Sequence, residues 1–187
     1  MVKVGFDFDG VLLYNPVRIF RPFVAVIKRL FIKKRALVFY YPHSAFEKFF
    51  WRLFHKSSIF VSPGVEDIKQ LIKQKKIKAY IITARYNFLG EEFKQWIKKN
   101  KFEDIFSEIY FNSKDEQPHL FKERMIKKLG LQVFVEDNFD IVKYLRYKNT
   151  AIVMWIYNIF DRGIYHRYKY PDLKRAVNAI LHETKTP

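Results

Sequence analysis

Short apolar runs alternate along the chain with segments in which apolar residues recur every three or four positions. The apolar runs are residues 2–6, 78–83, 108–111, 132–135 and 151–155. Their length predicts buried strands. The helical segments are residues 65–75, 91–99 and 121–129, the last followed by Gly130 in a C-cap position. This alternation predicts an α/β domain, a Rossmann-like parallel sheet with helices on both faces.

One long stretch breaks the alternation. Residues 14–61 are too long for a single crossover between strands. They predict two helical pieces, residues 17–34 and 44–54, separated by the aromatic segment 39–42. We therefore expect a small α-helical cap, residues 14–61, inserted into a core made of residues 1–13 and 62–187.

Composition limits the class of protein and the kind of site. About half of the 187 residues are apolar, with 20 Phe and 12 Tyr, as is typical of a globular chain. Cysteine is absent, so any metal must be bound by oxygen or imidazole. Basic residues interrupt the apolar stretch 23–39, and the amino terminus lacks the pattern of a signal peptide. We expect no transmembrane segment and a cytoplasmic location.

Positive charge is concentrated in the insertion. The chain has 35 basic and 19 acidic residues, a net charge of +16. In residues 13–63 only Glu47 is acidic, and the basic residues are Arg18, Arg21, Lys28, Arg29, Lys33, Lys34, Arg35, Lys48, Arg52 and Lys56. This excess predicts anionic partners: phosphorylated small molecules, nucleic acid or an anionic membrane surface. A lysine-rich composition with solvated charges explains it equally well.

Two carboxylates follow the first predicted strand. Asp7 and Asp9 can face one pocket if the strand ends there, and Gly10 gives the turn its conformational freedom. One aspartate can then attack phosphorus, while the other protonates the leaving oxygen and activates water. Because two carboxylates and a phosphate repel one another, this chemistry requires a cation, and Mg²⁺ suits an all-oxygen site. The alternative interpretation of both residues is a turn or a helix cap.

Three motifs follow one another along the chain, each at the end of a predicted strand. One, a strand followed by Asp-x-Asp-Gly, is residues 6–12. The next, a strand ending in Ser or Thr, is residues 81–85, and the last, a strand ending in paired acids, is residues 133–138. They resemble the first, second and fourth motifs of the haloacid dehalogenase (HAD) superfamily of phosphohydrolases, and the resemblance covers residues 2–161 outside the insertion. It implies a HAD-like core, Mg²⁺ as cofactor and a phosphomonoester hydrolase that forms an aspartyl-phosphate intermediate.

The resemblance also implies a role for each motif residue. Asp7 would be the nucleophile and a metal ligand, and Asp9 would be the general acid/base, with its backbone carbonyl also on the metal. Thr83 would bind the transferring phosphoryl group. Asp137 would hold the magnesium, with Glu136 in a supporting role.

The third motif of the superfamily is a lysine that neutralises the nucleophile and the phosphate. The sequence offers Lys114, Lys122, Lys127 and Lys128. Similar members have a lysine, about two helical turns, a glycine, a strand and then the acid pair. This register favours Lys122 over Lys114 as the catalytic lysine. For any one of these lysines taken alone, the alternative interpretation is a solvated helix face.

Two further segments resemble substrate-binding loops of the deoxyribonucleotidase-like branch. Thr83 is followed by Ala84 and Arg85, a sequence familiar in those members, and residues 155–158 resemble their Pro-Tyr-Asn loop without the proline. We therefore expect Ala84, Arg85 and Asn158 to bind substrate, with an ordinary turn as the alternative for Asn158. The histidines have no metal-binding spacing and are interpreted as surface or core residues: His43, His55, His119, His166 and His182.

The leading hypothesis is hydrolysis of a soluble phosphomonoester, with a nucleoside monophosphate favoured by the motif style. A second hypothesis keeps the chemistry but places the phosphate on a nucleic-acid end or a lipid. A third is a non-catalytic module that binds nucleic acid or a membrane surface through the basic insertion. The complete set of acids argues against the third, because a binding module has no physical need for them.

Overall fold

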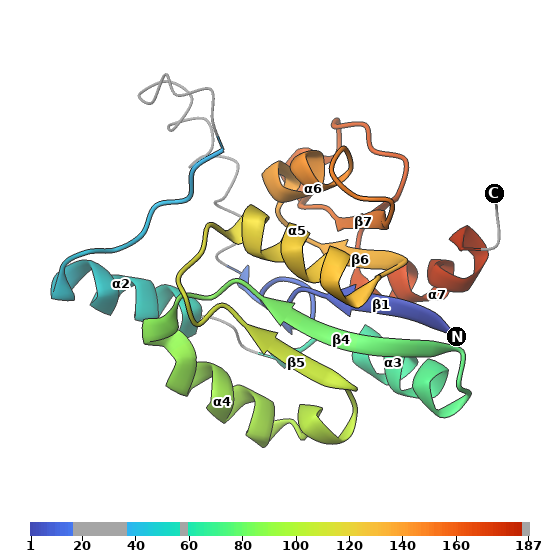
Figure 1. Ribbon diagram of the computed structural model, residues 1–187, viewed down its shortest axis with the longest axis horizontal. Helices are drawn as coiled ribbons and strands as arrows, with labels where there is room; N and C mark the ends of the chain where they lie inside the picture. The colour runs from blue at the N-terminus through green and yellow to red at the C-terminus, as the bar shows by residue number, and fades with distance from the viewer. Residues whose placement is uncertain (17–36, 57–59, 185–187) are drawn as a thin grey trace.

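The computed structural model describes residues 1–16, 37–56 and 60–184 (Figure 1). A six-stranded sheet lies at the centre, with strand order β5-β4-β1-β6-β7-β8 and every neighbouring pair parallel. The strands are β1 (Val2–Phe6), β4 (Ile77–Thr83), β5 (Glu108–Phe111), β6 (Val133–Glu136), β7 (Ile152–Ile156) and β8 (Lys169–Tyr170). The predicted parallel α/β sheet is confirmed, and β8 is an addition that the hydrophobic pattern did not predict.

Helices cover both faces of the sheet, as expected (Figure 1). One face packs against α3 (Gly64–Lys73), α4 (Gly90–Lys99) and α7 (Leu173–Glu183). The other packs against α5 (Pro118–Leu129) and α6 (Phe139–Leu145). Short 3₁₀ turns complete the connections: η2 (Asn87–Leu89), η3 (Phe102–Asp104) and η4 (Ile159–Asp161). The core is therefore two apolar layers separated by one sheet.

Local sequence explains where several elements begin and end. Gly130 ends α5 with φ of +59°, in the left-handed conformation expected of a C-cap glycine. Asp172 starts α7, since its carboxylate accepts a hydrogen bond from the Arg175 N–H. In β1, Val4 and Phe6 face the layer formed by α3, α4 and α7. Gly5 faces the other layer, where a Cβ would lie 2.6 Å from Leu131.

The insertion is joined to the core by a short antiparallel pair, β2 (Leu13–Tyr14) and β3 (Phe60–Val61). The rings of Tyr14 and Phe60 stack there with centroids 4.8 Å apart. Between these strands the structure describes one helix, α2 (Ala45–Lys56), close to the predicted helical piece 44–54. The other predicted piece, residues 17–34, falls outside the described residues.

The apolar stripe of α2 is exposed rather than buried. Its members recur at positions typical of a core-facing stripe, yet each is about half exposed or more: Phe46, Phe49, Phe50 and Leu53. The residues on the opposite side, Lys48, Trp51 and His55, are partly buried. The helix thus turns its more polar side toward the core domain.

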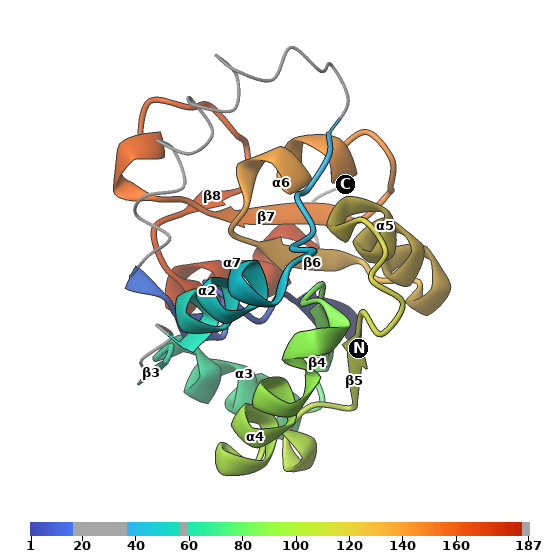
Figure 2. The ribbon, with the colours of Figure 1, turned by 90° about the vertical axis from the view of Figure 1, so that its left-hand side faces the viewer.

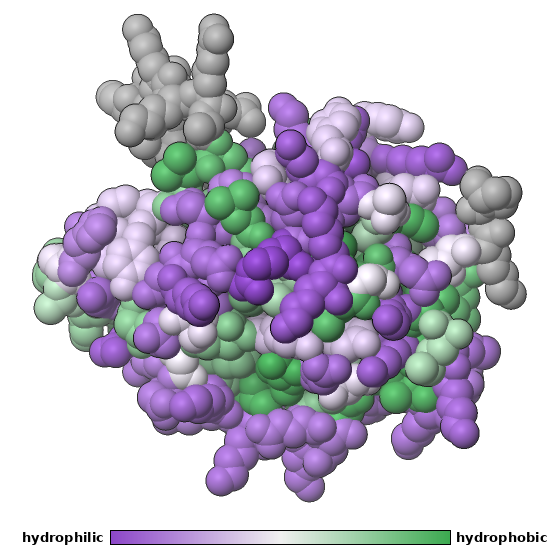
Figure 3. Space-filling view, in the orientation of Figure 1, coloured by the Kyte–Doolittle hydropathy of each residue, from purple (hydrophilic) through white to green (hydrophobic). Residues whose placement is uncertain are grey.

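The carboxyl ends of the strands point toward α2. Figure 2 views the molecule from that side and shows α2 lying in front of the sheet. The face drawn in Figure 3, over α5, is mostly hydrophilic. Among the helices of the described ranges, none combines the length and apolar character needed to cross a membrane.

Candidate active site

A tight loop after β1 sets the positions of Asp7 and Asp9. The Asp7 N–H donates to the Val135 carbonyl at 2.9 Å, which extends the pairing of β1 with β6 by one step. The Leu13 N–H then returns to the carbonyl of Phe8 at 2.9 Å. Gly10 has φ of +79°, and a Cβ on it would lie 2.2 Å from Oδ2 of Asp137. Only glycine fits at this position, because both the backbone conformation and the carboxylate exclude a side chain.

Asp7 lies beside a buried lysine. Nζ of Lys122, from the middle of α5, is 3.0 Å from Oδ2 of Asp7 and 2.6 Å from Oε2 of Glu136. All three side chains are buried. Lys114, the other lysine that the sequence offered for this position, is exposed on the loop before α5. The structure therefore brings Lys122, and not Lys114, to the first aspartate.

Three acids gather where β1 and β6 end. Each of Asp7, Glu136 and Asp137 offers an oxygen within 4.8 Å of the others, and all three residues are buried. Glu136 Oε1 accepts hydrogen bonds from the backbone N–H groups of Asp137 and Asn138. The Trp155 indole N–H donates to the Asp137 carbonyl at 3.1 Å. These contacts fix the backbone that carries the acids.

The electrostatics of this cluster favour a bound cation. Burial raises the pKa of Asp7 well above its usual value, and Glu136, Asp137 and Asp9 raise it further, against the lowering effect of Lys122. Burial also raises the pKa of Glu136. Burial would lower the pKa of Lys122, but Asp7 and Glu136 outweigh it and raise that pKa. One ammonium does not neutralise three buried carboxylates, so a divalent cation held by oxygen ligands fits this donor set.

Asp9 is held by Arg85. The guanidinium donates from Nε to Oδ2 and from Nη2 to Oδ1, each at 2.6 Å, and its carbon lies 4.9 Å from the centre of the Phe8 ring. Burial would raise the pKa of Asp9, but the charge and hydrogen bonds of Arg85 outweigh it and hold that pKa well below its usual range. Arg85, expected at the substrate, therefore binds the second aspartate in this structure.

His55 is a site residue that the sequence did not reveal. It was interpreted as a surface or core residue, yet its Nδ1 lies 3.5 Å from Oδ2 of Asp9, and its side chain is only 18% exposed. It belongs to α2, in the insertion. No local pattern distinguishes it from the other four histidines, since its role depends on where α2 lies.

The other expected site residues lie at strand ends as well. Thr83 is the last residue of β4 and is buried, and its Oγ1 is 3.4 Å from the Arg85 backbone nitrogen. Ala84 follows it and packs against the layer of α5 and α6. Asn158, after β7, accepts a hydrogen bond from the Phe160 N–H and caps η4. Asn158 therefore forms a turn in this structure, and its binding of substrate stays a prediction.

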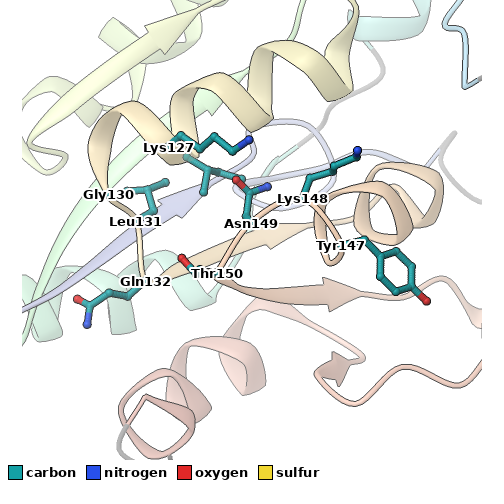
Figure 4. A pocket seen from close by; sticks show the side chains of 9 residues that line it. Lys127, Gly130, Leu131, Gln132, Tyr147, Lys148, Asn149 and Thr150 are labelled. Carbon is teal, nitrogen blue, oxygen red and sulfur yellow. The ribbon is translucent and has the colours of Figure 1, made fainter.

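A separate hollow lies at the opposite end of the sheet. Figure 4 shows its lining side chains on the turn that precedes β6 and the turn that precedes β7. Its volume is about 640 Å³. Lys127, Lys148 and Asn149 are among its lining residues. Because it is formed at the amino ends of these strands, it is not part of the acid cluster at their carboxyl ends.

Solved structures with a similar fold are HAD hydrolases and related proteins. A HAD-superfamily hydrolase from Ehrlichia chaffeensis has a TM-score of 0.54 at 14% identity, covering 96% of both chains. A haloacid dehalogenase-like hydrolase from Xanthomonas campestris has a TM-score of 0.58 at 14% identity, covering 100% of this chain and 99% of that one. CbbY from Rhodobacter sphaeroides, solved with phosphate, has a TM-score of 0.58 at 12% identity, covering 95% and 100%. The HAD-like fold expected from the motifs is confirmed.

Sequence similarity to curated proteins is weaker. Ninety-four residues are 27% identical to a protein named "Putative nucleotidase OB0422" from Oceanobacillus iheyensis. The match covers 50% of this chain and 48% of that protein, so the chain spans about half the length of the curated relative it matches. No known family model matches the chain.

Proposed function

We propose that this protein is a magnesium-dependent phosphomonoester hydrolase in which Asp7 is the covalent nucleophile. The observation that carries the proposal is the position of Asp7, which lies 3.0 Å from the buried ammonium of Lys122 and within the cluster formed with Glu136 and Asp137. A carboxylate so placed has a neighbouring positive charge and two further acids with which to share a cation, and attack on an anionic phosphate ester requires both.

The protein's own residues divide the reaction into two steps. In the first, a carboxylate oxygen of Asp7 attacks phosphorus, the bond from phosphorus to the ester oxygen breaks, and the alcohol leaves with a proton supplied by Asp9. In the second, Asp9 takes a proton from water, whose oxygen attacks phosphorus, and inorganic phosphate departs as the Asp7 carboxylate is regenerated. Lys122 and Thr83 are assigned to the phosphoryl oxygens.

Mg²⁺ is proposed as the cofactor because the acids fit it. Asp7, Asp137 and the backbone carbonyl of Asp9 are the proposed ligands, and the ion would supply charge neutralisation between the carboxylates and the phosphate. Glu136 is assigned to Lys122 and to the backbone N–H groups that follow it, which occupy both of its oxygens.

The pair formed by Arg85 and Asp9 has a chemical consequence. With both carboxylate oxygens accepting from the guanidinium, Asp9 is in its basic form, which suits the hydrolysis of the intermediate. Protonating a leaving group requires at least one oxygen to be released. A substrate phosphate can compete for Arg85, because guanidinium binds phosphate and carboxylate with the same two-donor geometry. In this way the proposed substrate-binding role of Arg85 is compatible with its contact to Asp9.

Nucleoside monophosphates are the proposed substrates, supported by the motif style around Thr83 and by the name of the curated relative. The test is turnover of a panel of nucleotides, sugar phosphates and aryl phosphates, with Mg²⁺ or with a chelator. Release of phosphate only in the presence of Mg²⁺ supports the proposal. So does a phosphoenzyme that forms in the unchanged protein and not in the Asp7→Asn variant. Turnover that is unchanged by the chelator would contradict it.

The insertion leaves a second candidate partner class, nucleic-acid ends or an anionic membrane surface. Of the ten basic residues between positions 13 and 63, seven lie in residues 17–36, outside the described residues. Of the other three, Lys48 lies near the Tyr41 and Phe88 rings, Arg52 pairs with Glu92, and Lys56 is a single exposed charge at the end of α2. The described part of the insertion therefore offers the apolar stripe of α2 rather than a basic face, and such a stripe favours a lipid surface over nucleic acid.

A further inference from the structure

α2 is fixed to the core on the side that carries His55. Arg52 lies 3.3 Å from the carboxylate of Glu92, and it donates to the Phe88 carbonyl at 3.3 Å. One turn earlier, Nζ of Lys48 lies about 6 Å from the centres of the Tyr41 and Phe88 rings. These contacts hold α2 against η2 and the start of α4, so that the last turn of the helix projects His55 toward the loop after β1.

His55 and Arg85 meet on one oxygen of Asp9. Oδ1 accepts from Nη2 of Arg85, whereas Oδ2 accepts from Nε of Arg85 and lies 3.5 Å from His55 Nδ1. Asp9 and Arg85 both belong to the core, at the ends of β1 and β4. His55 is the member of this group that comes from the insertion. The orientation of the Asp9 carboxylate therefore depends on two separate parts of the chain.

We propose that His55 is a positioning residue for Asp9, through which the seating of α2 on the core orients the carboxylate that exchanges protons with the leaving group and with water. The proposal rests on the proposed phosphohydrolase function for its kinetic consequence but not for the contact itself. When Arg85 turns toward a substrate phosphate, the imidazole still faces Oδ2 and limits rotation of the carboxylate. Without it, Asp9 keeps its chemistry but loses a fixed orientation.

The kinetic test compares leaving groups. His55→Ala is expected to lower kcat by about tenfold on alkyl phosphates, which need a proton from Asp9, with little change in KM. On aryl phosphates, whose leaving groups depart without a proton, the expected loss is at most about twofold. His55→Asn should recover most of the alkyl activity, because the Asn amide nitrogen can occupy the place of Nδ1. Equal losses on both ester classes, or a change confined to KM, would overturn the positioning role.

The matched control is His43→Ala. His43 lies in the same insertion and packs edge-on against Tyr40 and Tyr41, without contact to Asp9. The His43→Ala substitution should therefore leave the ratio of kcat on alkyl phosphates to kcat on aryl phosphates unchanged. The same shift in that ratio from His43→Ala and His55→Ala would mean that loosening the insertion, and not the contact with Asp9, causes the effect, and the proposal would fail.

A second readout does not depend on activity. Amide hydrogen exchange of residues 45–56 is measured in the full chain for the unchanged protein, His55→Ala, Asp9→Ala and the double variant. If the contact between the two side chains holds α2 on the core, each single substitution speeds amide exchange in α2. The double variant then exchanges no faster than the single variants. If the changes in exchange rate from the two single variants add in the double variant, the two side chains do not act through one contact, and the proposal fails. Coupled exchange in a protein that hydrolyses none of the esters would instead retain the contact and overturn the proposed function.

Discussion

Lys122 donates a hydrogen bond to Oε2 of Glu136 at 2.6 Å, and this buried pair joins the middle of α5 to the end of β6. The same ammonium reaches Asp7. Glu136 thus orients the lysine that faces the first aspartate, while its other oxygen binds the backbone of the next two residues. The position of Lys122 is consequently set by a residue that is neither the proposed nucleophile nor a proposed metal ligand.

Replacing Lys122 is expected to remove activity, whereas replacing Lys114 is not. Lys122→Ala should lower kcat by at least about a hundredfold, because the positive charge beside Asp7 is lost in the transition state. Lys114→Ala is the matched control, since that lysine is exposed. The kcat of this variant should differ from that of the unchanged protein by less than about twofold. Steady-state rates on one aryl phosphate provide the measurement. The reverse order would assign the third motif to Lys114.

The same substitution is also expected to reduce stability. Lys122→Ala leaves Glu136 buried without its partner, at a cost of about 3–5 kcal/mol in the free energy of unfolding. The double variant Lys122→Met with Glu136→Gln removes both charges and should recover most of this loss. Urea denaturation measures both, and a double variant that folds but stays inactive separates the catalytic effect from the structural one. A double variant with normal turnover would contradict the role of Lys122.

Asp7→Asn should abolish turnover and leave the protein folded. The amide keeps the shape of the side chain but cannot form an acyl phosphate, so less than about a hundredth of the kcat should remain. Asp104→Asn, at an exposed acid in η3, the turn that follows α4, is the control. Rates and acid-quenched phosphoenzyme are measured together. Retention of a larger rate would rule out the covalent mechanism.

The two acids after β6 should differ in their effect on magnesium. Asp137→Asn is expected to raise the Mg²⁺ concentration needed for half-maximal rate by about tenfold or more, because it removes a proposed anionic ligand. Glu136→Gln should raise it less and should lower kcat instead, because Glu136 holds Lys122. Magnesium titrations of initial rate test this. The opposite ranking would exchange the assigned roles of the two residues.

Stability should depend on pH in a way that Mg²⁺ removes. The folded pKa of Asp7 is raised, mainly by burial. In the metal-free protein its contribution to stability is therefore complete below its unfolded pKa of about 3.9 and is lost as pH rises through the folded pKa. Asp7→Asn should then stabilise the metal-free protein at neutral pH but not near pH 4. Asp9, whose pKa is lowered chiefly by Arg85 against the effect of burial, acts in the opposite sense, losing its contribution as pH falls.

Adding Mg²⁺ should change the stability of the protein in a pH-dependent way. Binding to the ionised acids should raise the free energy of unfolding at neutral pH, by about 2.7 kcal/mol at a concentration one hundred times Kd. The increase should shrink as pH falls, and Asp137→Asn should reduce it. Thermal or urea unfolding with and without Mg²⁺ measures it. The same increase in the unchanged protein and in Asp137→Asn would place the cation elsewhere.

The partner of the insertion can be determined by salt dependence. A mononucleotide offers one or two phosphates, so its KM should rise only modestly with salt, whereas single-stranded nucleic acid would lose affinity with a log-log slope of about 0.7 per phosphate contact. Sedimentation with anionic liposomes tests the membrane surface. Replacing Phe49 and Phe50 with Ser reports on the apolar stripe of α2, and replacing Lys33, Lys34 and Arg35 with Gln reports on the basic residues. Tight, steeply salt-dependent oligonucleotide binding would contradict a small-molecule substrate.

The sequence by itself determined the alternation of strands and helices and the order of the motifs. Local spacing is enough for this, because a buried strand needs a continuous apolar run and a crossover helix needs a periodic one. Parallel pairing then brings the carboxyl ends of β1, β4 and β6 to one edge of the sheet, so Asp7, Thr83 and Asp137 all lie at that edge. Compared with similar members of the superfamily, the register of Lys122 before Gly130 and β6 favoured it over Lys114, and the structure brings Lys122 to within 3.0 Å of Asp7.

Only the tertiary structure decided how α2 lies and what holds Asp9. Periodicity marks Phe46, Phe49, Phe50 and Leu53 as one face of a helix, but it does not say that this face is exposed while His55 turns inward. The ion pair between Arg85 and Asp9 joins residues 76 positions apart in the chain. Such contacts depend on the three-dimensional path of the loops and the insertion. A local pattern of apolar and polar residues carries no information about that path.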